Sequence, residues 1–399
     1  MNREEKKIVP QLRFPEFKDN WKTASLKDVS SYFNGKSFEG DVQENGKYEL
    51  VTLKSIDTDG NLVHSNRYIN DDVKTLAKGT LVMILSEQAP GLLGMTAIIP
   101  DNNKYVLNQR VAEIRPTDKV VNYFLSMAIN RNQSYFSRLG AGMKVQNISK
   151  GNVENYELSY PSIAEQKKIA NCFSSLDVII NSETEKLALL QDHKKGLLQQ
   201  LFPVEVETQP KFRFPEFKDD WKIKEVGEIF DVTRGYVLSM SLVSETKTEE
   251  NKYPVYSSQT KNNGLAGFYN AFLYENAITW TTDGANAGDV NFREGKFYCT
   301  NVCGVLLSKN GFANKCVAEI INSVAKKHVS YIGNPKLMNG VMSKIKISIP
   351  SLKEQQKIAD CLSAADELIE AQAQKIKALQ EHKKGLLQQL FPNLNELAI

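Results

Sequence analysis

Several features that would place this chain in a familiar class are missing from its sequence. The longest run of purely aliphatic or methionine residues extends only from Leu81 to Leu85, whereas a membrane helix needs about 20 apolar residues. The five cysteines are odd in number and widely scattered, which argues against a disulfide framework. The charged start MNREEKK leads into no apolar stretch, so no secretory signal is predicted. We therefore expect a reduced, cytoplasmic protein that does not enter a membrane.

Catalytic motifs are missing as well. The sequence has no G-x-x-x-x-G-K-[ST] phosphate loop and no Asn-Pro-Pro-aromatic motif of the amino-methyltransferase kind. Cys299 and Cys303 lack a neighbouring histidine and a common zinc spacing, so we expect buried free thiols on one face of a strand. Asp101 and Glu113 loosely resemble a nuclease pair, but Arg115 replaces the lysine of such a core. The sequence thus predicts no catalytic residue and no metal site.

A strong excess of either charge is also missing, because the net charge is only +3 at pH 7. Charge alone therefore does not indicate a nucleic-acid partner, and any basic surface must be local. With 399 residues, of which 41% are hydrophobic, the chain is long enough to bury ordinary cores in two or three domains.

What the sequence does contain is a long internal repeat. RFPEFKDNW at 13–21 returns as RFPEFKDDW at 213–221, and HKKGLLQQLFP at 193–203 returns unchanged at 382–392. Long stretches between these copies are much less alike. The chain therefore consists of two copies of one unit, each with a short tag, a long variable block and a long near-invariant segment.

The near-invariant segments begin at Pro161 and Pro350 and match at ten of their first seventeen positions. Ser162-x-x-Glu165, which is repeated in the second copy, predicts a capping box in which both side chains satisfy free backbone donors of a first helical turn. Pro203 and its counterpart end the segments, because the residue before a proline is pushed out of helical geometry. Two helices of about 40 residues, or roughly 60 Å each, are predicted.

Apolar residues recur along both helices in steps of four and three, the spacing of a narrow seam that requires a partner helix. The predicted interface consists of Leu176, Ile180, Leu187, Leu190, Leu197, Leu201, Ala365, Ile369, Ile376, Leu379, Leu386 and Leu390. We predict an antiparallel pairing that sets Leu176 against Leu390 and Glu183 opposite Lys383. A shift by one heptad would place the Glu183 charge against an apolar side chain. Two separate core helices are the alternative.

The variable blocks, at about 22–160 and 222–349, are predicted to be mixed α/β domains with many short strands. Apolar β-branched runs such as LVMIL and ITWTT alternate with clusters of glycine, asparagine and aspartate. Gly35 and Gly235 stand at the same distance from their tags. These features predict two domains of one fold whose loops differ, as expected if they bind different ligands.

Tandem variable blocks, each preceded by Arg-Phe-Pro-x-Phe and followed by a helix that begins PSIAEQKKIA or PSLKEQQKIA, resemble the specificity subunit of type I restriction-modification systems. The resemblance covers nearly the whole chain. It implies an α+β fold in which two mixed α/β target recognition domains are joined by two long antiparallel coiled-coil helices with a pseudo-twofold internal repeat. The predicted divisions are 1–160 for the first recognition domain with its tag, 161–203 for the central spacer helix, 204–349 for the second domain with its tag, 350–392 for the C-terminal spacer helix and 393–399 for a tail.

The same resemblance implies a non-catalytic function. Each variable domain would read one half of an asymmetric, split double-stranded DNA target, and the helices would set the gap. Two methyltransferase subunits and two ATP-dependent translocase/nuclease subunits would assemble around the chain. S-adenosylmethionine, ATP and Mg are expected on those partners, and no cofactor on this chain. The alternative is a two-headed coiled-coil adaptor whose variable domains bind proteins instead of DNA.

DNA reading requires side chains that bond base edges and others that grip phosphates. The candidates in the first block are Asn34, Lys36, Ser37, Ser86, Gln88, Asn108, Gln109, Arg110, Lys144 and Gln146. Those in the second block are Arg234, Tyr236, Ser258, Gln259, Lys261, Thr282, Asn286, Asn301 and Lys336. Any one of them is as often a solvated loop residue, so the prediction concerns the loops as groups.

Overall fold

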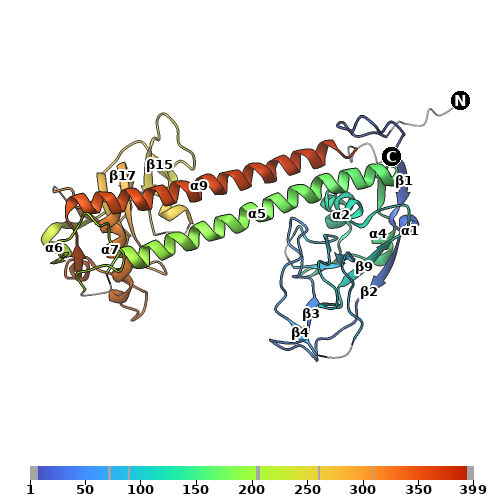
Figure 1. Cartoon of the computed structure of the whole chain (residues 1–399), viewed down its shortest axis with the longest axis horizontal. Helices are drawn as coiled ribbons and strands as arrows, with labels where there is room; N and C mark the ends of the chain where they lie inside the picture. The colour runs from blue at the N-terminus through green and yellow to red at the C-terminus, as the bar shows by residue number, and fades with distance from the viewer. Residues whose placement is uncertain are drawn as a thin grey trace. The chain divides into compact units, whose positions relative to one another are not determined.

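The chain forms two compact units in a computed structural model that describes residues 8–70, 73–88, 90–203, 207–258, 261–308 and 310–392. Unit 1 consists of Met1–Glu183 with Lys375–Ile399, and unit 2 is Thr184–Gln374. Both units are mixed α/β domains, as predicted (Figure 1). Within the described ranges, no helix combines the length and apolarity needed to cross a membrane. The predicted tail at 393–399 lies outside the described residues.

Unit 1 is built on two small sheets. Its strands are β1 (Lys22–Ser25), β2 (Ser30–Asn34), β3 (Tyr48–Val51), β4 (Tyr68–Ile69), β5 (Leu81–Ile84), β6 (Ser86–Glu87), β7 (Thr96–Ile98), β8 (Tyr105–Leu107), β9 (Val111–Pro116), β10 (Gln146–Asn147) and β11 (Glu157–Tyr160). Its short helices are α1 (Leu26–Val29), α2 (Asn122–Asn130), α3 (Gln133–Leu139) and α4 (Lys150–Glu154). The sheets have the orders β2-β9-β5-β7 and β4-β3-β8, while β1 pairs with β11 and β6 with β10.

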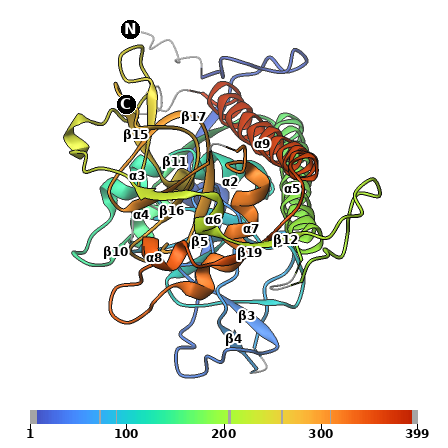
Figure 2. The same cartoon turned by 90° about the vertical axis from the view of Figure 1, so that its left-hand side faces the viewer.

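Unit 2 carries one larger sheet of order β13-β18-β16-β17-β14-β15, and β12 pairs with β19. Its strands are β12 (Lys222–Glu225), β13 (Asp231–Arg234), β14 (Tyr253–Tyr256), β15 (Leu265–Tyr269), β16 (Tyr274–Thr281), β17 (Val290–Cys299), β18 (Cys303–Leu307) and β19 (Lys346–Ile349). Its short helices are α6 (Val226–Ile229), α7 (Lys315–Ala325), α8 (Asn339–Met342) and the 3-10 turns η1 (Met240–Leu242), η2 (Lys261–Gly264) and η3 (Lys326–His328). Helix α7 packs its apolar side against this sheet (Figure 2).

Two equivalent glycines reveal that the units share one scaffold. The Gly35 N–H donates to the Val111 carbonyl at 3.0 Å, and the Gly235 N–H donates to the Cys303 carbonyl at 2.9 Å. In both units the glycine follows the first strand of the main sheet, and its partner begins the neighbouring strand. The predicted correspondence of Gly35 and Gly235 is therefore confirmed, and it aligns Val111 with Cys303.

A second shared bond fixes a helix to each sheet. The Thr96 N–H donates to Asn130 Oδ1 at 2.8 Å at the end of α2, and the Val290 N–H donates to Asn322 Oδ1 at 3.0 Å on α7. An asparagine that caps a strand from a helix satisfies a backbone donor that packing would otherwise bury without a partner. The prediction that the two blocks share one fold is thus confirmed by these equivalent contacts.

The tag of the first copy is fixed by a buried carboxylate. Arg13 donates to both oxygens of Glu165, each at 2.8 Å, and the Trp21 indole N–H donates to the same carboxylate at 3.3 Å. Only the serine half of the predicted capping box is seen, in which Ser162 Oγ accepts the Glu165 N–H at 3.4 Å. The assignment of the glutamate to the helix cap is therefore corrected, because its carboxylate instead holds the tag against the start of α5 (Ile163–Leu201).

The second tag repeats this arrangement. Arg213 donates to the two oxygens of Glu354 at 2.8 and 2.9 Å, and Trp221 donates to it at 3.2 Å. Glu354 lies in the first turn of α9 (Leu352–Gln389). The guanidinium of arginine matches the geometry of a carboxylate. Because both copies of the tag make this same contact, the requirement for it explains why the tags repeat almost letter for letter.

The repeated HKKGLLQQLFP segments end inside domain cores. In unit 1, Leu390 is buried, and the Phe391 ring stacks on that of Phe124 at 5.1 Å between centroids. In unit 2, Leu201 and Phe202 are buried in the cluster that contains α7. The division into compact units consequently falls within α5 and α9, although these helices begin within two residues of the predicted boundaries at 161 and 350.

Ion pairs within unit 1 determine how its parts of α5 and α9 pair. Lys383 Nζ lies 2.5 Å from Asp177 Oδ1, and Lys375 Nζ lies 2.6 Å from Glu183 Oε1. The two segments therefore run antiparallel, but the predicted opposition of Glu183 and Lys383 is wrong. The register is shifted by almost one heptad relative to the predicted one. The shift is tolerated because Glu183 forms an ion pair with Lys375 and so avoids the contact with an apolar side chain that was expected to forbid it.

Unit 2 has the equivalent ion pair, in which Lys194 Nζ lies 2.7 Å from Asp366 Oδ1. Its residues stand at the positions of Lys383 and Asp177 in the repeat, so both units use the same register. The twelve predicted seam residues are all buried or half-buried, whereas neighbouring apolar residues such as Val178 are exposed.

Candidate DNA interface

The predicted residues of unit 1 come together where the strands of its sheets end. Strand β2 ends at Asn34, which pairs with Ala112, and Ile84 at the end of β5 pairs with Val111 at the start of β9. Strand β8 ends directly before Asn108. The residues gathered here are Asn34, Lys36, Ser37, Ser86, Gln88, Asn108, Gln109 and Arg110. We call this the polar edge of unit 1.

The turn around Met143 reaches the same edge through β10. Gln146 pairs with Glu87 and Asn147 with Ser86, and the Ser86 hydroxyl donates to Asn147 Oδ1 at 2.6 Å. Lys144, in the same turn, is exposed. Four segments that are far apart in the sequence therefore supply one surface.

Members of the polar edge divide into exposed groups and groups that hold the loops. The exposed ones are Asn34, Lys36, Ser37, Gln88, Arg110 and Lys144, while Gln109 and Gln146 are half-buried. Asn108 is only 1% exposed. Its amide accepts the Phe38 N–H at 3.3 Å and the Gln109 N–H at 2.9 Å and donates to Glu39 at 3.3 Å. The structure therefore gives Asn108, like the buried Ser86, a role in shaping the edge.

Gly35 is needed at this edge for a steric reason. A Cβ atom at Gly35 would lie 1.9 Å from the Asn108 carbonyl oxygen. No side chain tolerates that approach, so only glycine allows the loop after β2 to pass over the end of β8.

Unit 2 has a corresponding polar edge at the ends of β13, β14, β16 and β17 and the start of β18. The predicted residues that lie on it are Arg234, Tyr236, Ser258, Thr282, Asn286, Asn301 and Lys336. Arg234 Nη2 donates to the Asn301 carbonyl at 3.3 Å, and Asn286 Nδ2 donates to the Ser258 carbonyl at 3.1 Å. Thr282 is 1% exposed and holds the Val302 carbonyl at 3.0 Å. Gln259 and the Lys261 side chain lie outside the described residues.

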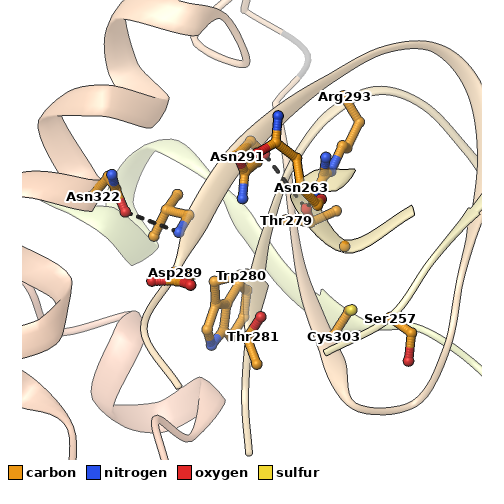
Figure 3. A pocket seen from close by; sticks show the side chains of 12 residues that line it. Ser257, Asn263, Thr279, Trp280, Thr281, Asp289, Asn291, Arg293, Cys303 and Asn322 are labelled. Atoms are coloured by element: carbon orange, nitrogen blue, oxygen red, sulfur yellow. Dashed lines mark hydrogen bonds between the residues drawn. The ribbon is translucent and has the colours of Figure 1, made fainter. Parts of the chain in front are cut away.

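A polar pocket opens directly behind the edge of unit 2 (Figure 3). Its volume is about 150 Å³, and it is lined by side chains of β16 and β17 together with those of Ser257 and Asn263. Arg293 from the middle of β17 is 8% exposed and donates to Thr279 Oγ1 at 3.0 Å and to the Asn263 carbonyl at 2.7 Å. Sequence reasoning missed this arginine, because a charged residue inside a strand gives no loop signal.

Cys303 lines this pocket, and both Cys303 and Cys299 are buried free thiols, as predicted. Cys299 ends β17 and Cys303 begins β18, so the expectation that both lie in one strand is wrong. A turn separates them, and they nevertheless enter one apolar cluster. Burial raises the pKa of Cys303 to about 11 and raises that of Cys299 as well.

No group of three or more metal-ligating side chains occurs within the described ranges. The acidic residues that loosely resembled a nuclease pair are each engaged by a neighbour. Asp101 pairs with Lys104 at 2.8 Å, and Glu113 pairs with Arg115 at 2.6 Å.

Comparisons with known proteins assign both halves of the chain to one domain family. A family model described as the type I restriction modification DNA specificity domain matches residues 18–192 and 218–381. A putative type I restriction enzyme specificity subunit of Methanocaldococcus jannaschii is 23% identical over 409 residues, which cover 94% of each chain. The N-terminal part of a putative type I specificity subunit of Mycoplasma pneumoniae is 40% identical over 144 residues, which cover 35% of this chain and 75% of that protein.

Among solved structures, the S subunit of a type I restriction-modification system from M. genitalium matches 97% of this chain and 100% of that chain. The TM-score is 0.65 at 17% identity, so the two chains share their fold. The family model covers each variable block together with most of the helix that follows it. Specificity subunits recognise DNA sequences and carry no catalytic activity of their own. The chain belongs to the family of type I restriction-modification DNA specificity subunits.

Proposed function

We propose that each unit reads one half of an asymmetric, split DNA target with its polar edge. The observation that carries this proposal is the convergence of separate loops on one edge in both units. Exposed amides and hydroxyls there suit base edges, and the exposed cations Lys36, Arg110, Lys144 and Arg234 suit phosphates. Because the two edges carry different side chains, the two half-sites should differ.

The long helices act in this proposal as an antiparallel coiled-coil spacer with pseudo-twofold symmetry. Support comes from the matching ion pairs of α5 and α9 within each unit and from the twelve seam residues, all of which are buried or half-buried. A spacer of fixed length sets the gap between half-sites, as the geometry of a rigid dimer does.

Two methyltransferase subunits dock, in this proposal, on the exposed parts of the repeated HKKGLLQQLFP segments, and two ATP-dependent translocase/nuclease subunits join them. Leucine and phenylalanine side chains of these segments are committed to the cores, but Lys195 and Lys384 are exposed at equivalent positions. S-adenosylmethionine, ATP and Mg would be bound by the partners. Charge reversal of both lysines should weaken assembly without unfolding the helices, since exposed lysines contribute little to stability. Unchanged assembly would refute this docking surface.

A block exchange tests independent reading directly. Residues 22–160 are replaced by the equivalent block of a relative with a different target, and methylated adenines are mapped in cells that carry the complete system. We expect one half of the motif to change while the other half and the gap persist. Insertion of four residues, about one turn, into both helices is the matched variant and should alter only the gap. A block exchange that alters both halves contradicts independent reading.

Protein binding by the variable domains is the second candidate function, favoured by the nearly balanced charge. Salt dependence separates the two. DNA affinity that depends on phosphate contacts falls steeply as salt is added, whereas loss of DNA binding at all salt concentrations with retained capture of a protein would favour the adaptor.

A further inference from the structure

Arg293 is a buried charge without an opposite charge. Its guanidinium lies 3.8 Å from the centroid of the Tyr256 ring and is bonded to the hydroxyl of Thr279 and the carbonyl of Asn263. Among the ion pairs of the described residues, none involves Arg293. Burial lowers its pKa, yet an arginine remains protonated in proteins. Unit 2 therefore holds an uncompensated positive charge inside its sheet.

The fold itself does not require this charge. Counting along the paired strands from the equivalent residues Val111 and Cys303 brings Ile99 of unit 1 to the position of Arg293. Ile99 is completely buried in an apolar cluster. Replacing such a residue by an unpaired charge costs free energy. That cost indicates a role other than folding.

The space beside Arg293 suits a small anion. The pocket of about 150 Å³ is smaller than the roughly 300 Å³ or more of sites for drug-sized ligands, so it fits a single small group. The Asp289 carboxylate also lines it but is engaged by Lys326 at 2.7 Å. With one carboxylate and two cations, the pocket and its immediate neighbour carry a net positive charge. Figure 3 shows Asn263 next to Arg293, whereas Ser257 lies at the other end of the pocket, where its hydroxyl accepts a hydrogen bond from Thr300 at 3.0 Å.

We propose that this pocket binds a phosphate-type oxyanion, held by the Arg293 guanidinium with the amide of Asn263. Two sources share this chemistry, a backbone phosphate of bound DNA and a free phosphate ion. The DNA source rests on the proposed function, because Ser257 and Thr281 place the pocket directly behind the polar edge of unit 2. The free-ion source does not.

Thermal unfolding of the full-length protein in inorganic phosphate tests the site without DNA, with potassium chloride of equal ionic strength as the reference. At about 100 times the dissociation constant, phosphate should raise the Tm of the wild-type protein by about 5 °C or more. Arg293→Met should lose this shift. A cooperative transition in the same scan establishes that the variant is folded, and Arg293→Gln replaces it if it is not.

Arg131 offers a matched control in unit 1. It also lies over an aromatic ring, 5.2 Å from the centroid of Phe391, and donates to the Pro392 carbonyl at 2.8 Å. The space beside it is only about 10 Å³, too small for an anion. Arg131→Met should therefore keep the phosphate-dependent shift, whatever it does to basal stability.

Salt titration of DNA binding then identifies the source. If a backbone phosphate enters the pocket, Arg293→Met should bind DNA more weakly. The slope of log affinity against log salt concentration should also become less steep by the amount expected for the loss of about one phosphate contact. A lost phosphate shift with unchanged DNA binding assigns the site to free phosphate. If neither the shift nor the slope depends on Arg293, the proposal is overturned. A wild-type protein that binds no DNA would contradict the proposed function alone, since the phosphate titration still tests the pocket.

Discussion

Unit 1 and unit 2 have the same contacts where they meet their tags and different contacts where their strands end. Arg13 and Arg213 grip equivalent buried glutamates through the same donor atoms at almost identical distances. At the polar edges, by contrast, the side chains at the strand ends of unit 1 differ from those at the strand ends of unit 2. The comparison teaches that the scaffold is fixed by a few directional bonds, which leaves the strand ends free to vary without loss of the fold.

The interiors differ as well, one layer below the edge. Unit 1 fills the face of its sheet with an apolar cluster that includes Val82 and Ile99. Unit 2 has a polar pocket around Arg293 at that place and a smaller apolar cluster that contains Cys299 and Cys303. Variation between the two units thus extends from their loops into their cores.

The largest effect is expected from breaking the shared glycine contact. A Cβ at Gly35 would lie 1.9 Å from the Asn108 carbonyl oxygen, and one at Gly235 would lie 2.3 Å from that of Thr300. Gly35→Ala and Gly235→Ala should each lower the free energy of unfolding of their own unit by about 3 kcal/mol, because a backbone carbonyl cannot yield as a side chain does. Denaturation followed through Trp21 reports unit 1, which contains no other tryptophan.

Gly40 and Gly340 provide the matched controls, because a Cβ at either would meet no atom within 4 Å. Alanine at these positions should leave the stability of both units unchanged. A Gly235→Ala protein as stable as the wild type would mean that the two edges are not built alike.

Loss of the tag arginines should have the next largest effect. Arg13→Met or Arg213→Met leaves a glutamate with a 2% exposed side chain without its cation. Each should cost about 2 to 3 kcal/mol, and the two losses should be equal within error. Urea denaturation of each variant measures this. Glu16→Gln, which removes only the exposed pair with Lys168, should change nothing, and unequal losses would break the equivalence of the tags.

Exchange of a core residue between the units should have a small effect. Cys303 occupies the position of Val111, so Cys303→Val should change stability by less than about 1 kcal/mol. Because burial raises its pKa from 9.0 to about 11, the neutral thiol stabilises unit 2 fully below pH 9. That contribution is lost as pH rises from 9 towards 11. The valine variant should therefore unfold at a higher pH than the wild type in an alkaline titration, and identical titrations would contradict this.

The smallest effect concerns the register of the long helices. A double-mutant cycle to alanine at Asp177 and Lys383 should give a coupling free energy of about 0.5 kcal/mol, the usual value for a partly exposed ion pair. The same cycle at Glu183 and Lys383 should give none. Measured coupling of the second pair would restore the register that the heptad pattern predicted.

The sequence predicted the repeat, the two long helices and the mixed α/β blocks, because hydrophobic period, caps and prolines are local signals. It misplaced Glu165 in a helix cap, since the contact of that residue with Arg13 spans 152 positions. It also chose the wrong register for α5 and α9. The register with Glu183 opposite an apolar residue was expected to be unfavourable. In the structure, the Glu183 side chain is long enough to form an ion pair with the neighbouring Lys375 instead.

For the candidate site, sequence reasoning selected residues that the fold brings to one edge in each unit, but it did not distinguish the exposed residues from the buried ones. Asn108 and Thr282 are buried and hold carbonyl or amide groups of the backbone, which no composition rule distinguishes from base reading. Arg293 was missed because it stands out only when it is compared with Ile99, the buried apolar residue at the equivalent position of unit 1. Both failures concern burial, which is a property of the folded domain and not of a short segment.

The assignment of Lys375–Ile399 to unit 1 has a consequence for biosynthesis. Unit 2 is one continuous stretch, whereas the core of unit 1 packs Trp21 against Phe391, 5.8 Å apart. A ribosome therefore delivers every residue of the second domain before it delivers the last residues of the first. Nascent domains usually fold from the N-terminus onward, but here the domain that begins first must be completed last. A premature stop codon a few residues upstream of Phe391 should accordingly damage the N-terminal domain and spare the one next to it in sequence.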